Sequence, residues 1–265
     1  MKIVIPMSGT GSRFQKAGYE TIKPLIEVNG KPFIEWVCNL FPGEDDFIFI
    51  CRDEHLRETN LREVLNKIRP TGKIVEVEGH KFGPVYAVSK VYDLLEDDEP
   101  VIVNYCDFYM HWDYADFKRM VATNQCAGAI PSYTGFHPHL MHEHNVYATT
   151  LVDEQLYASE IKEKHHYNQD KTKDYHSGGT YYFSKGTYVK KYFQELMDRK
   201  MALNGEYYVS MVYELLIENQ LPVWVYDKVP HFCQWGTPSD LEEFLYWMSI
   251  FNYKKQIESA IELSE

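Results

Sequence analysis

Short apolar runs alternate with helix-like stretches through the first half of the chain. The apolar runs are rich in β-branched or aromatic residues and short enough for buried strands, and they cover residues 3–7, 47–51, 73–77 and 101–104. The stretches with apolar residues at helical spacing cover residues 33–41, 55–68 and 84–95. Because strands that alternate with helices form parallel sheets, this half predicts an α/β fold with helices on both faces of a sheet.

The second half is less regular. Strand-like runs cover residues 127–133, 146–151, 157–162, 179–183, 223–226 and 232–235, and helical patterns cover residues 184–200 and 206–218. Residues 164–176 are charged and hydrophilic, which predicts a loop. A last helix follows the capping sequence of residues 237–240, and its apolar face carries Leu241, Phe244, Leu245, Met248 and Phe251.

Composition excludes several classes of function. The chain has 265 residues, 45% of them hydrophobic, and a formal net charge of −12, which argues against nucleic acid or an anionic membrane as a partner. No run approaches the ~18 apolar residues of a membrane span, and the first apolar run is too short for a signal peptide, so we expect a cytoplasmic protein. The five cysteines are scattered without a CxxC pair, as expected for free thiols in a reducing compartment.

The strongest chemical signal is the turn after the first apolar run. Residues 6–13 read Pro-Met-Ser-Gly-Thr-Gly-Ser-Arg, and Lys23 follows ten residues later in a Lys-Pro-Leu sequence. Gly9 and Gly11 allow the backbone to curl so that successive N–H groups point at one anion. Arg13 and Lys23 add the side-chain positive charge that a polyphosphate needs. An ordinary strand-to-helix turn accounts for the glycines alone, so the two cations favour a nucleoside triphosphate site.

Two common phosphate-binding motifs do not fit this turn. The dinucleotide fingerprint GxGxxG needs a glycine where Phe14 stands, and a Walker loop needs a lysine followed by Ser or Thr at a spacing that the chain lacks. What remains is G-x-G-[ST]-R followed by K-P-L. With this combination the chain resembles nucleotidyltransferases that join a nucleoside triphosphate to a phosphorylated acceptor, such as the sugar-1-phosphate and phosphocholine pyrophosphorylase-type enzymes. Within them it resembles the capsule-locus branch of small cytidylyltransferases, which includes an enzyme that makes CDP-glutamine from phosphoglutamine.

The resemblance extends over nearly the whole chain. Together with the alternation of elements, it implies a Rossmann-like three-layer sandwich with a mainly parallel, mixed central sheet and a small acceptor-binding lobe. We expect one nucleotidyltransferase domain over residues 1–265. Its parts are a nucleotide-binding half (1–130), an acceptor-binding half (131–236) and a C-terminal helix (237–265).

The resemblance also assigns residues to substrates and metal. For the nucleotide it implies the turn and the start of a later helix, namely Pro6, Met7, Ser8, Gly9, Thr10, Gly11, Ser12, Arg13 and Gly83. For the acceptor it implies Lys23, Glu163, Lys164, Gly179 and Glu206. Asp107 resembles the family's magnesium-binding aspartate, so Mg²⁺ is the expected cofactor. The place of Asp107 after a parallel strand and its hard oxygen ligands suit that ion.

Joining two phosphates brings an anionic nucleophile to an anionic α-phosphate, so the site must neutralise charge and align the reacting groups. We expect Arg13 to hold the β- and γ-phosphates and Lys23 to act at the attacked α-phosphate, and these are the expected catalytic residues. The acceptor phosphate is ionised at neutral pH, so no strong general base is needed. Gln234 stands where the family commonly has a second magnesium carboxylate. Three alternatives follow. The metal is held by Asp107 with phosphates and water, another carboxylate replaces the missing one, or the protein is less active.

The sequence therefore predicts a magnesium-dependent nucleotidyltransferase that makes an NDP-linked product and pyrophosphate, for capsule or surface polysaccharide precursors. CTP is favoured by the likeness to the capsule branch, and the acceptor is a sugar phosphate or a phosphoglutamine-like compound. A glycosyltransferase using a nucleotide sugar is disfavoured, because Asp107-Phe108-Tyr109 lacks the second acid of a DxD motif. A non-catalytic nucleotide-binding regulatory protein stays open because of Gln234. The oligomeric state also stays open, with a homodimer among the options.

Three further patterns allow more than one interpretation. His137, His139, His142 and His144 alternate like zinc ligands, but no cysteine or HExxH motif accompanies them, so a polar loop over the acceptor pocket is favoured. Glu206 is expected to cap a helix or, alternatively, to hydrogen-bond the acceptor. Lys164 with the two histidines that follow it forms either a basic patch for the acceptor phosphate or a solvated loop.

Overall fold

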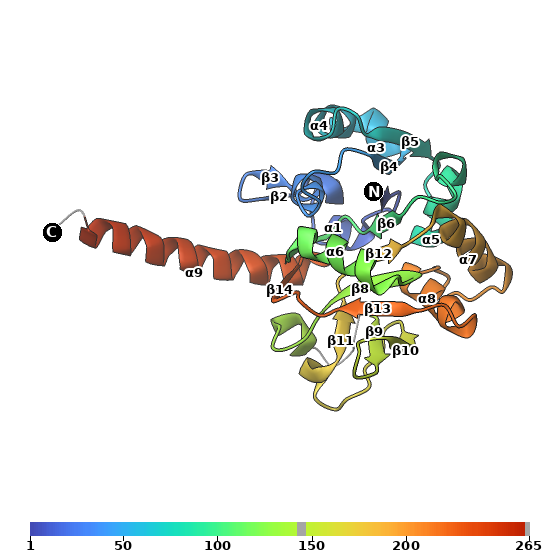
Figure 1. Ribbon diagram of the computed structural model, residues 1–265. Coiled ribbons are helices and arrows are strands. Elements are labelled where there is room, and N and C mark those ends of the chain that lie inside the picture. Colours follow the sequence, from blue (N-terminus) through green and yellow to red (C-terminus); the bar gives the residue numbers. More distant parts are fainter. Residues whose placement is uncertain (142–146, 263–265) are drawn as a thin grey trace.

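One central sheet organises the chain. In the computed structural model, which describes residues 1–141 and 147–262, ten strands join in the order β10-β9-β11-β8-β12-β6-β1-β4-β5, with β13 paired to β8 (Figure 1). The strands are β1 (Lys2–Met7), β4 (Phe47–Arg52), β5 (Lys73–Val77), β6 (Val101–Asn104), β8 (Gly128–Tyr133), β9 (Thr149–Val152), β10 (Ala158–Lys162), β11 (Tyr175–Ser177), β12 (Thr180–Phe183) and β13 (Val223–Tyr226). Strands β6, β1, β4 and β5 are parallel, whereas β12 runs antiparallel to both its neighbours. The predicted mixed α/β fold is confirmed.

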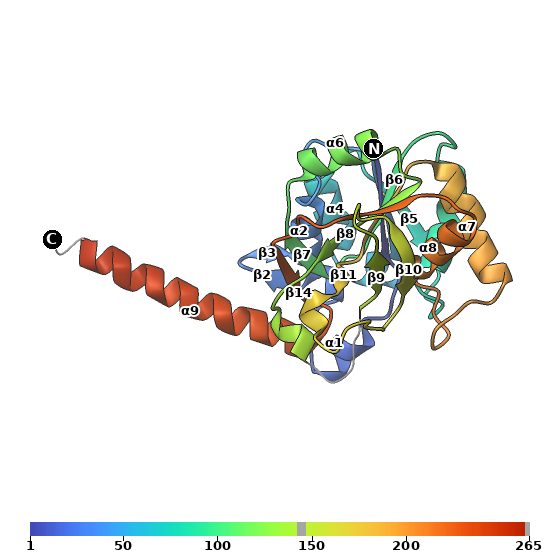
Figure 2. The same cartoon turned by 60° about the horizontal axis from the view of Figure 1, so that its bottom comes forward.

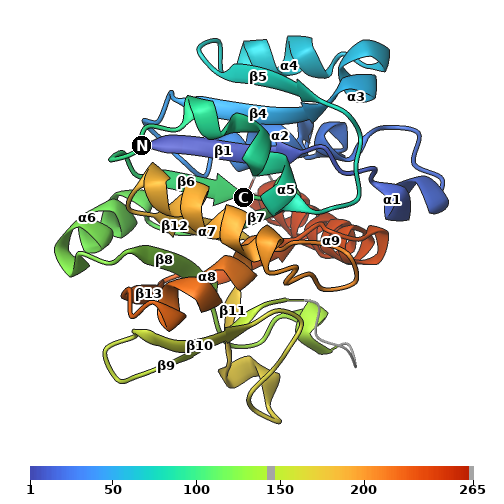
Figure 3. The same ribbon diagram turned by 90° about the vertical axis from the view of Figure 1, so that its right-hand side faces the viewer.

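Helices cover both faces of the sheet (Figure 3). One face carries α2 (Phe33–Cys38), α4 (Leu61–Ile68) and α6 (Tyr114–Asn124), and the other carries α5 (Pro84–Val88), the 3₁₀ segment η2 (Ser89–Leu94), α7 (Gly186–Asp198) and α8 (Val209–Glu218). Side chains alternate along a strand, so Ile3 and Ile5 of β1 enter the first core while Val4 enters the second. All three are fully buried, which explains why the parallel strands are continuous apolar runs.

A smaller layer stands beside the sheet near its carboxyl edge. Strand β7 (Phe108–His111) pairs antiparallel with β14 (His231–Gln234), and the short strands β2 (Glu27–Val28) and β3 (Lys31–Pro32) form a second ribbon. Trp235 follows β14 and is stacked on Phe33 with ring centroids 5.0 Å apart. The remaining elements are α1 (Ser12–Lys16), η1 (Lys23–Leu25), α3 (Asp53–Glu58), η3 (Pro138–Met141) and η4 (Lys171–Lys173).

The structure corrects several expected elements. The helix predicted over residues 55–68 is broken into α3 and α4, because Thr59 has an extended backbone and its hydroxyl donates to the His55 carbonyl oxygen at 2.7 Å. Residues 164–176 are not all loop, since they contain η4 and the start of β11. Helix α6 and strand β7 were not predicted, because neither shows a clean apolar period.

The last helix, α9 (Pro238–Glu262), runs away from the body (Figures 1 and 2). Leu241 is buried and Phe244 packs on Trp235, with ring centroids 5.4 Å apart. Leu245 and Phe251, however, are 37% and 57% exposed, so the body covers only the first part of the apolar face. The reason is geometric: the helix extends beyond the edge of the body after its second turn. Among the described residues, no helix is long and apolar enough to cross a membrane.

Candidate active site

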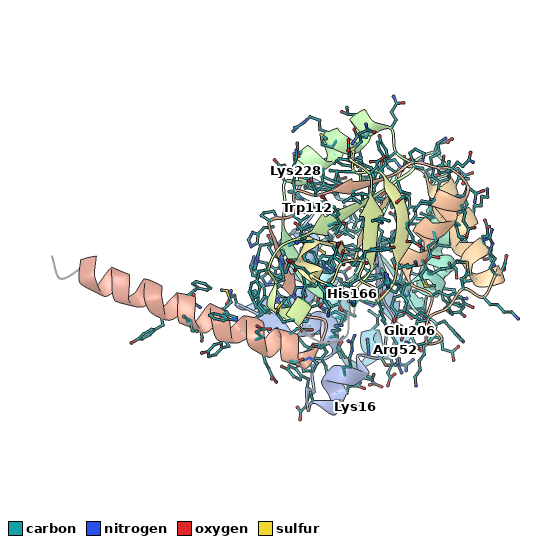
Figure 4. All side chains as sticks on the ribbon, turned by 90° about the horizontal axis from the view of Figure 1, so that it is seen from below. Lys16, Arg52, Trp112, His166, Glu206 and Lys228 are labelled. Carbon is teal, nitrogen blue, oxygen red and sulfur yellow. The ribbon has the colours of Figure 1, made fainter. Side chains whose placement is uncertain are left out.

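A cavity of about 410 Å³ lies where β1, β5 and β6 end. The carboxyl edge of parallel strands is where open α/β sheets bind ligands. Glu206, labelled in Figure 4, reaches the cavity from the segment before α8. The lining residues are Pro6, Met7, Ser8, Gly9, Thr10, Gly11, Ser12, Arg13, Phe14, Lys23, Pro24, His80, Lys81, Gly83, Pro84, Tyr105, Cys106, Asp107, Glu206 and Tyr208.

The turn between β1 and α1 forms one wall of this cavity. Gly11 precedes α1 with φ at 63°, a left-handed conformation that glycine adopts without strain. Its carbonyl oxygen accepts the N–H groups of Phe14 and Gln15 at 3.0 and 3.3 Å, which closes the turn. A Cβ atom at Gly11 would lie 3.7 Å from Cβ of Lys23, so the turn and the lysine stand side by side.

Lys23 and Asp107 form an ion pair in this cavity. The Lys23 ammonium donates to Asp107 Oδ2 at 2.6 Å and to the Gly236 carbonyl oxygen at 3.2 Å. The two side chains are 16% and 24% exposed, and the ammonium also lies 5.5 Å from the Phe14 ring centroid. Three segments far apart in sequence therefore hold one cation in place, and that cation neutralises the carboxylate.

Asp107 is a single carboxylate with an amide beside it. Strand pairing sets Gln234 opposite Phe108, and a Cβ atom at Gly236 would approach Gln234 Nε2 to 2.7 Å and Asp107 Oδ2 to 3.2 Å. Among the described residues, no three His, Cys, Asp or Glu side chains converge as a metal site. Mg²⁺ commonly binds through one or two carboxylates plus substrate phosphates, so this donor set fits that ion only with the phosphates of a bound nucleotide.

On the opposite wall, Ser8 and His80 link the turn to the segment after β5. Ser8 Oγ lies 2.9 Å from His80 Nε2, and the Phe82 N–H donates to His80 Nδ1 at 3.3 Å. Burial, and then Lys90, lower the pKa of His80, so the ring is neutral at pH 7. With Nδ1 accepting, the proton is on Nε2 and is donated to Ser8. The Ser8 hydroxyl proton is then available to an acceptor in the cavity.

Gly83 joins the two halves of the cavity. Its φ is 86°, and a Cβ atom there would lie 2.8 Å from both the backbone nitrogen and the carbonyl oxygen of Tyr207. The Tyr207 N–H donates to the Phe82 carbonyl oxygen at 2.9 Å, and the Val85 N–H donates to the Tyr207 carbonyl oxygen at 3.2 Å. A side chain at Gly83 would push these segments apart. This close contact sets Glu206 on the cavity wall.

Glu206 does not cap α8, contrary to one of the two expectations for it. The capping position belongs to Tyr208, and no side chain makes a cap hydrogen bond there. Glu206 instead lines the cavity together with Tyr208.

Lys23, also expected at the acceptor, lines the cavity, whereas Glu163, Lys164 and Gly179 do not. Lys164 contacts a residue of the cavity lining, since its ammonium donates to the Tyr208 hydroxyl at 3.0 Å. Glu163 accepts a hydrogen bond from the Ser210 hydroxyl, and burial raises its pKa to about 7. Gly179 lies behind Tyr105, where a Cβ atom would approach the ring to 2.9 Å.

Two of the four alternating histidines are structural. His137 and His139 are 2% and 6% exposed, so they do not form the expected polar loop over the pocket. His137 Nε2 accepts the Phe232 N–H at 3.2 Å, and His139 Nε2 lies 2.9 Å from the Tyr133 hydroxyl. Burial lowers the pKa of His137. His142 and His144 lie outside the described residues.

Sequence reasoning assigned no role at the site to His80, Tyr105 or Tyr208. The signal for His80 was its position in the turn between β5 and α5, since the carboxyl ends of parallel strands meet. Tyr105 lies two residues before the expected metal ligand, and its hydroxyl accepts the Val209 N–H at 3.2 Å. Tyr208 could be placed only by the long-range contact of Gly83.

Comparisons with known proteins identify a family and a fold for the chain. A profile of the MobA-like NTP transferase domain matches residues 3–168. The nucleoside-diphosphate-sugar pyrophosphorylase from Vibrio cholerae RC9 superposes with a TM-score of 0.75 at 20% identity, covering 92% of this chain and 99% of that chain. The inositol-1-phosphate CTP transferase from T. maritima superposes with a TM-score of 0.71 at 15% identity, covering 92% and 93%. At these identities the two structures support the fold. No curated protein sequence matches the chain.

Proposed function

The chain belongs to the MobA-like NTP transferase family, and from this premise we propose that it is an enzyme that joins the nucleotidyl group of an NTP to a phosphorylated small molecule. An oxygen of the acceptor phosphate attacks the α-phosphorus, the bond between the α-phosphorus and its bridging oxygen breaks, and pyrophosphate leaves. The observation that carries the proposal is the Lys23–Asp107 ion pair, held at 2.6 Å beside the glycine-rich turn.

The residues of the cavity have distinct tasks in this reaction. The turn backbone and Arg13 hold the β- and γ-phosphates, and Lys23 neutralises charge at the α-phosphate, where it builds up during attack. Asp107 would hold Mg²⁺ together with the nucleotide phosphates, and the ion would supply charge neutralisation and a template for them.

We assign the base to the wall formed by Ser8, His80 and Gly83, within a nucleotide-binding half of residues 1–130. The Ser8 hydroxyl is a donor, and cytosine presents two acceptors, O2 and N3, so this wall suits CTP. The preference rests also on the likeness to capsule-locus cytidylyltransferases and on the structural similarity to the T. maritima protein, which is a CTP transferase. Uracil and thymine also present carbonyl oxygens, so a comparison of nucleotides is required.

The acceptor enters from the half built by residues 131–236, beside Glu206 and Tyr208. We propose a sugar phosphate or a phosphoglutamine-like compound, used for capsule or surface polysaccharide precursors in the cytoplasm. Lys164, through its contact with Tyr208, is placed to move onto the acceptor phosphate. Glu163 and Gly179 shape this side from behind the wall.

A pyrophosphate-release assay with each of the four common NTPs, Mg²⁺ and a panel of phosphorylated acceptors tests the proposal. We expect pyrophosphate only when an NTP and a suitable acceptor are both present. Release of a nucleoside diphosphate from a nucleotide sugar would favour the glycosyltransferase alternative. Nucleotide binding without pyrophosphate in any combination would favour the regulatory one.

A further inference from the structure

Helix α9 carries a row of large side chains that the body does not cover. Tyr246, Trp247, Ile250, Phe251 and Tyr253 are 61%, 47%, 39%, 57% and 65% exposed, and we call these five residues the aromatic stripe. The helix extends away from the body (Figure 1), and side chains project from it into solvent (Figure 4). Scattered exposed apolar residues are normal on a protein surface, but a contiguous group of this size marks an interaction surface.

The aromatic stripe occupies one face of the helix. Its members follow the spacing i, i+1, i+4, i+5 and i+7, which at about 100° per residue keeps them within one side of the helix. The opposite face carries Leu241, which is buried against the body, Leu245, which is 37% exposed, and Asn252, whose side chain is exposed. The aromatic stripe is the more exposed of the two faces, and an apolar surface that the body leaves uncovered is expected to bind a partner.

We propose that the aromatic stripe binds the same stripe of a second copy of this chain, with the two helices antiparallel. A two-fold axis midway between Trp247 and Ile250 sets each of them against the other in the second copy, and it sets Tyr246 against Phe251. Glu242 and Glu243 lie in the first two turns of α9. A parallel pair sets these two carboxylates of one copy beside those of the other, whereas an antiparallel pair keeps them apart.

The area available is what a modest dimer needs. The four rings of the stripe expose roughly 500 Å² per copy, taking about 200 Å² for a whole aromatic side chain. Two copies then bury about 1,000 Å², which is the lower limit for a specific interface. An anionic membrane is a poorer occupant, because the chain has a net charge of −12. The dimer does not depend on the proposed activity.

Sedimentation velocity of the full chain at rising concentration tests the proposal. We expect the wild type to shift to the mass of a dimer at micromolar concentrations, and Trp247→Glu to remain a monomer. The matched control is Asn252→Glu, which adds the same charge on the opposite face and should still dimerise. A wild type that stays monomeric would overturn the proposal, as would a Trp247→Glu protein that dimerises like the control. Dissociation of Asn252→Glu would refute the assigned face.

Cross-linking tests the orientation of the helices. When differently tagged Tyr246→Cys and Phe251→Cys chains are mixed and oxidised, an antiparallel pair gives the mixed disulfide. A parallel pair gives disulfides between chains of the same variant, and that result would refute the arrangement. Wild type is the background control, since four of its five cysteines are buried and Cys106 is half-buried. If the wild type is monomeric in solution but sediments with vesicles containing anionic lipid, the partner of the aromatic stripe is a membrane and not a second copy.

Discussion

Lys23→Met is the sharpest perturbation of the proposed site. The substitution removes the ammonium but keeps an unbranched side chain of similar length next to the Phe14 ring. In the free protein that ammonium is fixed by Asp107 at 2.6 Å and by the Gly236 carbonyl oxygen at 3.2 Å. It is therefore already positioned when the nucleotide enters, which is the condition for strong electrostatic catalysis.

The expected loss is kinetic. Removing one preorganised donor from a developing anion costs about 10²- to 10³-fold in kcat, or about 2.7–4 kcal/mol. The KM for the nucleotide should change little, because Arg13 and the turn still hold the β- and γ-phosphates. The loss of a partly exposed ion pair costs about 1 kcal/mol or less in stability. The Tm should therefore fall by no more than about 4 °C.

The assay is pyrophosphate release at saturating nucleotide and acceptor, together with a thermal melt. Lys16→Met is the matched control, because Lys16 is an exposed lysine of α1 outside the cavity lining (Figure 4). We expect the control to keep wild-type kcat. Near-normal kcat in Lys23→Met would show that this ammonium does not act at the α-phosphate. A collapse of the melting temperature would show instead that the ion pair is structural.

Three further predictions concern other walls of the site. Gly83→Ala should lower the free energy of unfolding by about 2 kcal/mol or more, because Cβ would lie 2.8 Å from Tyr207 backbone atoms. The control is Gly135→Ala, since Gly135 has a similar φ but no atom within 4 Å of its Cβ position. In denaturant melts this control should lose about 1 kcal/mol or less. Burial raises the pKa of Glu163 from 4.5 to about 7, so its neutral carboxyl group stabilises the fold below pH 4.5, and this stabilisation is lost as pH rises through 7. Glu163→Gln should remove this contribution, on the order of 2–3 kcal/mol, from the pH dependence of the free energy of unfolding. An unchanged pH profile would contradict the prediction. Ser8→Ala should raise the KM for the preferred nucleotide about 5- to 10-fold with kcat little changed, and an equal KM for every base would argue against base recognition by Ser8.

The fold of the first half could be predicted because its strands are buried on both faces. Ile3, Val4 and Ile5 are all fully buried, so the strand is a continuous apolar run in the sequence as well as in space. The second half could be predicted less well, since its strands are short and most of them are antiparallel to their neighbours. The predicted helix boundaries were wrong where a single side chain determines them, as Thr59 does between α3 and α4.

For the candidate site, the sequence predicted the features that depend on nearby residues and missed the features that depend on contacts with distant segments. The turn with Gly11 and the approach of Lys23 follow from spacing along the chain. The position of Asp107 follows from the rule that parallel strands end at one edge, but its ion pair with Lys23 was not predicted. Tyr208 and the neutral tautomer of His80, by contrast, depend on contacts with segments far away in sequence.

The outcome for α9 shows the same limit. Its sequence pattern is that of a helix packed along one face, and Leu241 does pack. No local feature reveals that the body ends after two turns, which leaves the aromatic stripe uncovered.

The most direct test of the account follows the α-phosphorus. CTP labelled at that atom is incubated with the protein, Mg²⁺ and, in turn, glucose 1-phosphate, inositol 1-phosphate, phosphocholine and phosphoglutamine. The account predicts that the label appears in a compound with a new phosphate–phosphate bond to one acceptor, while an equal amount of unlabelled pyrophosphate is released. Label that stays in CTP with every acceptor, or that ends in free CMP or CDP, would contradict it.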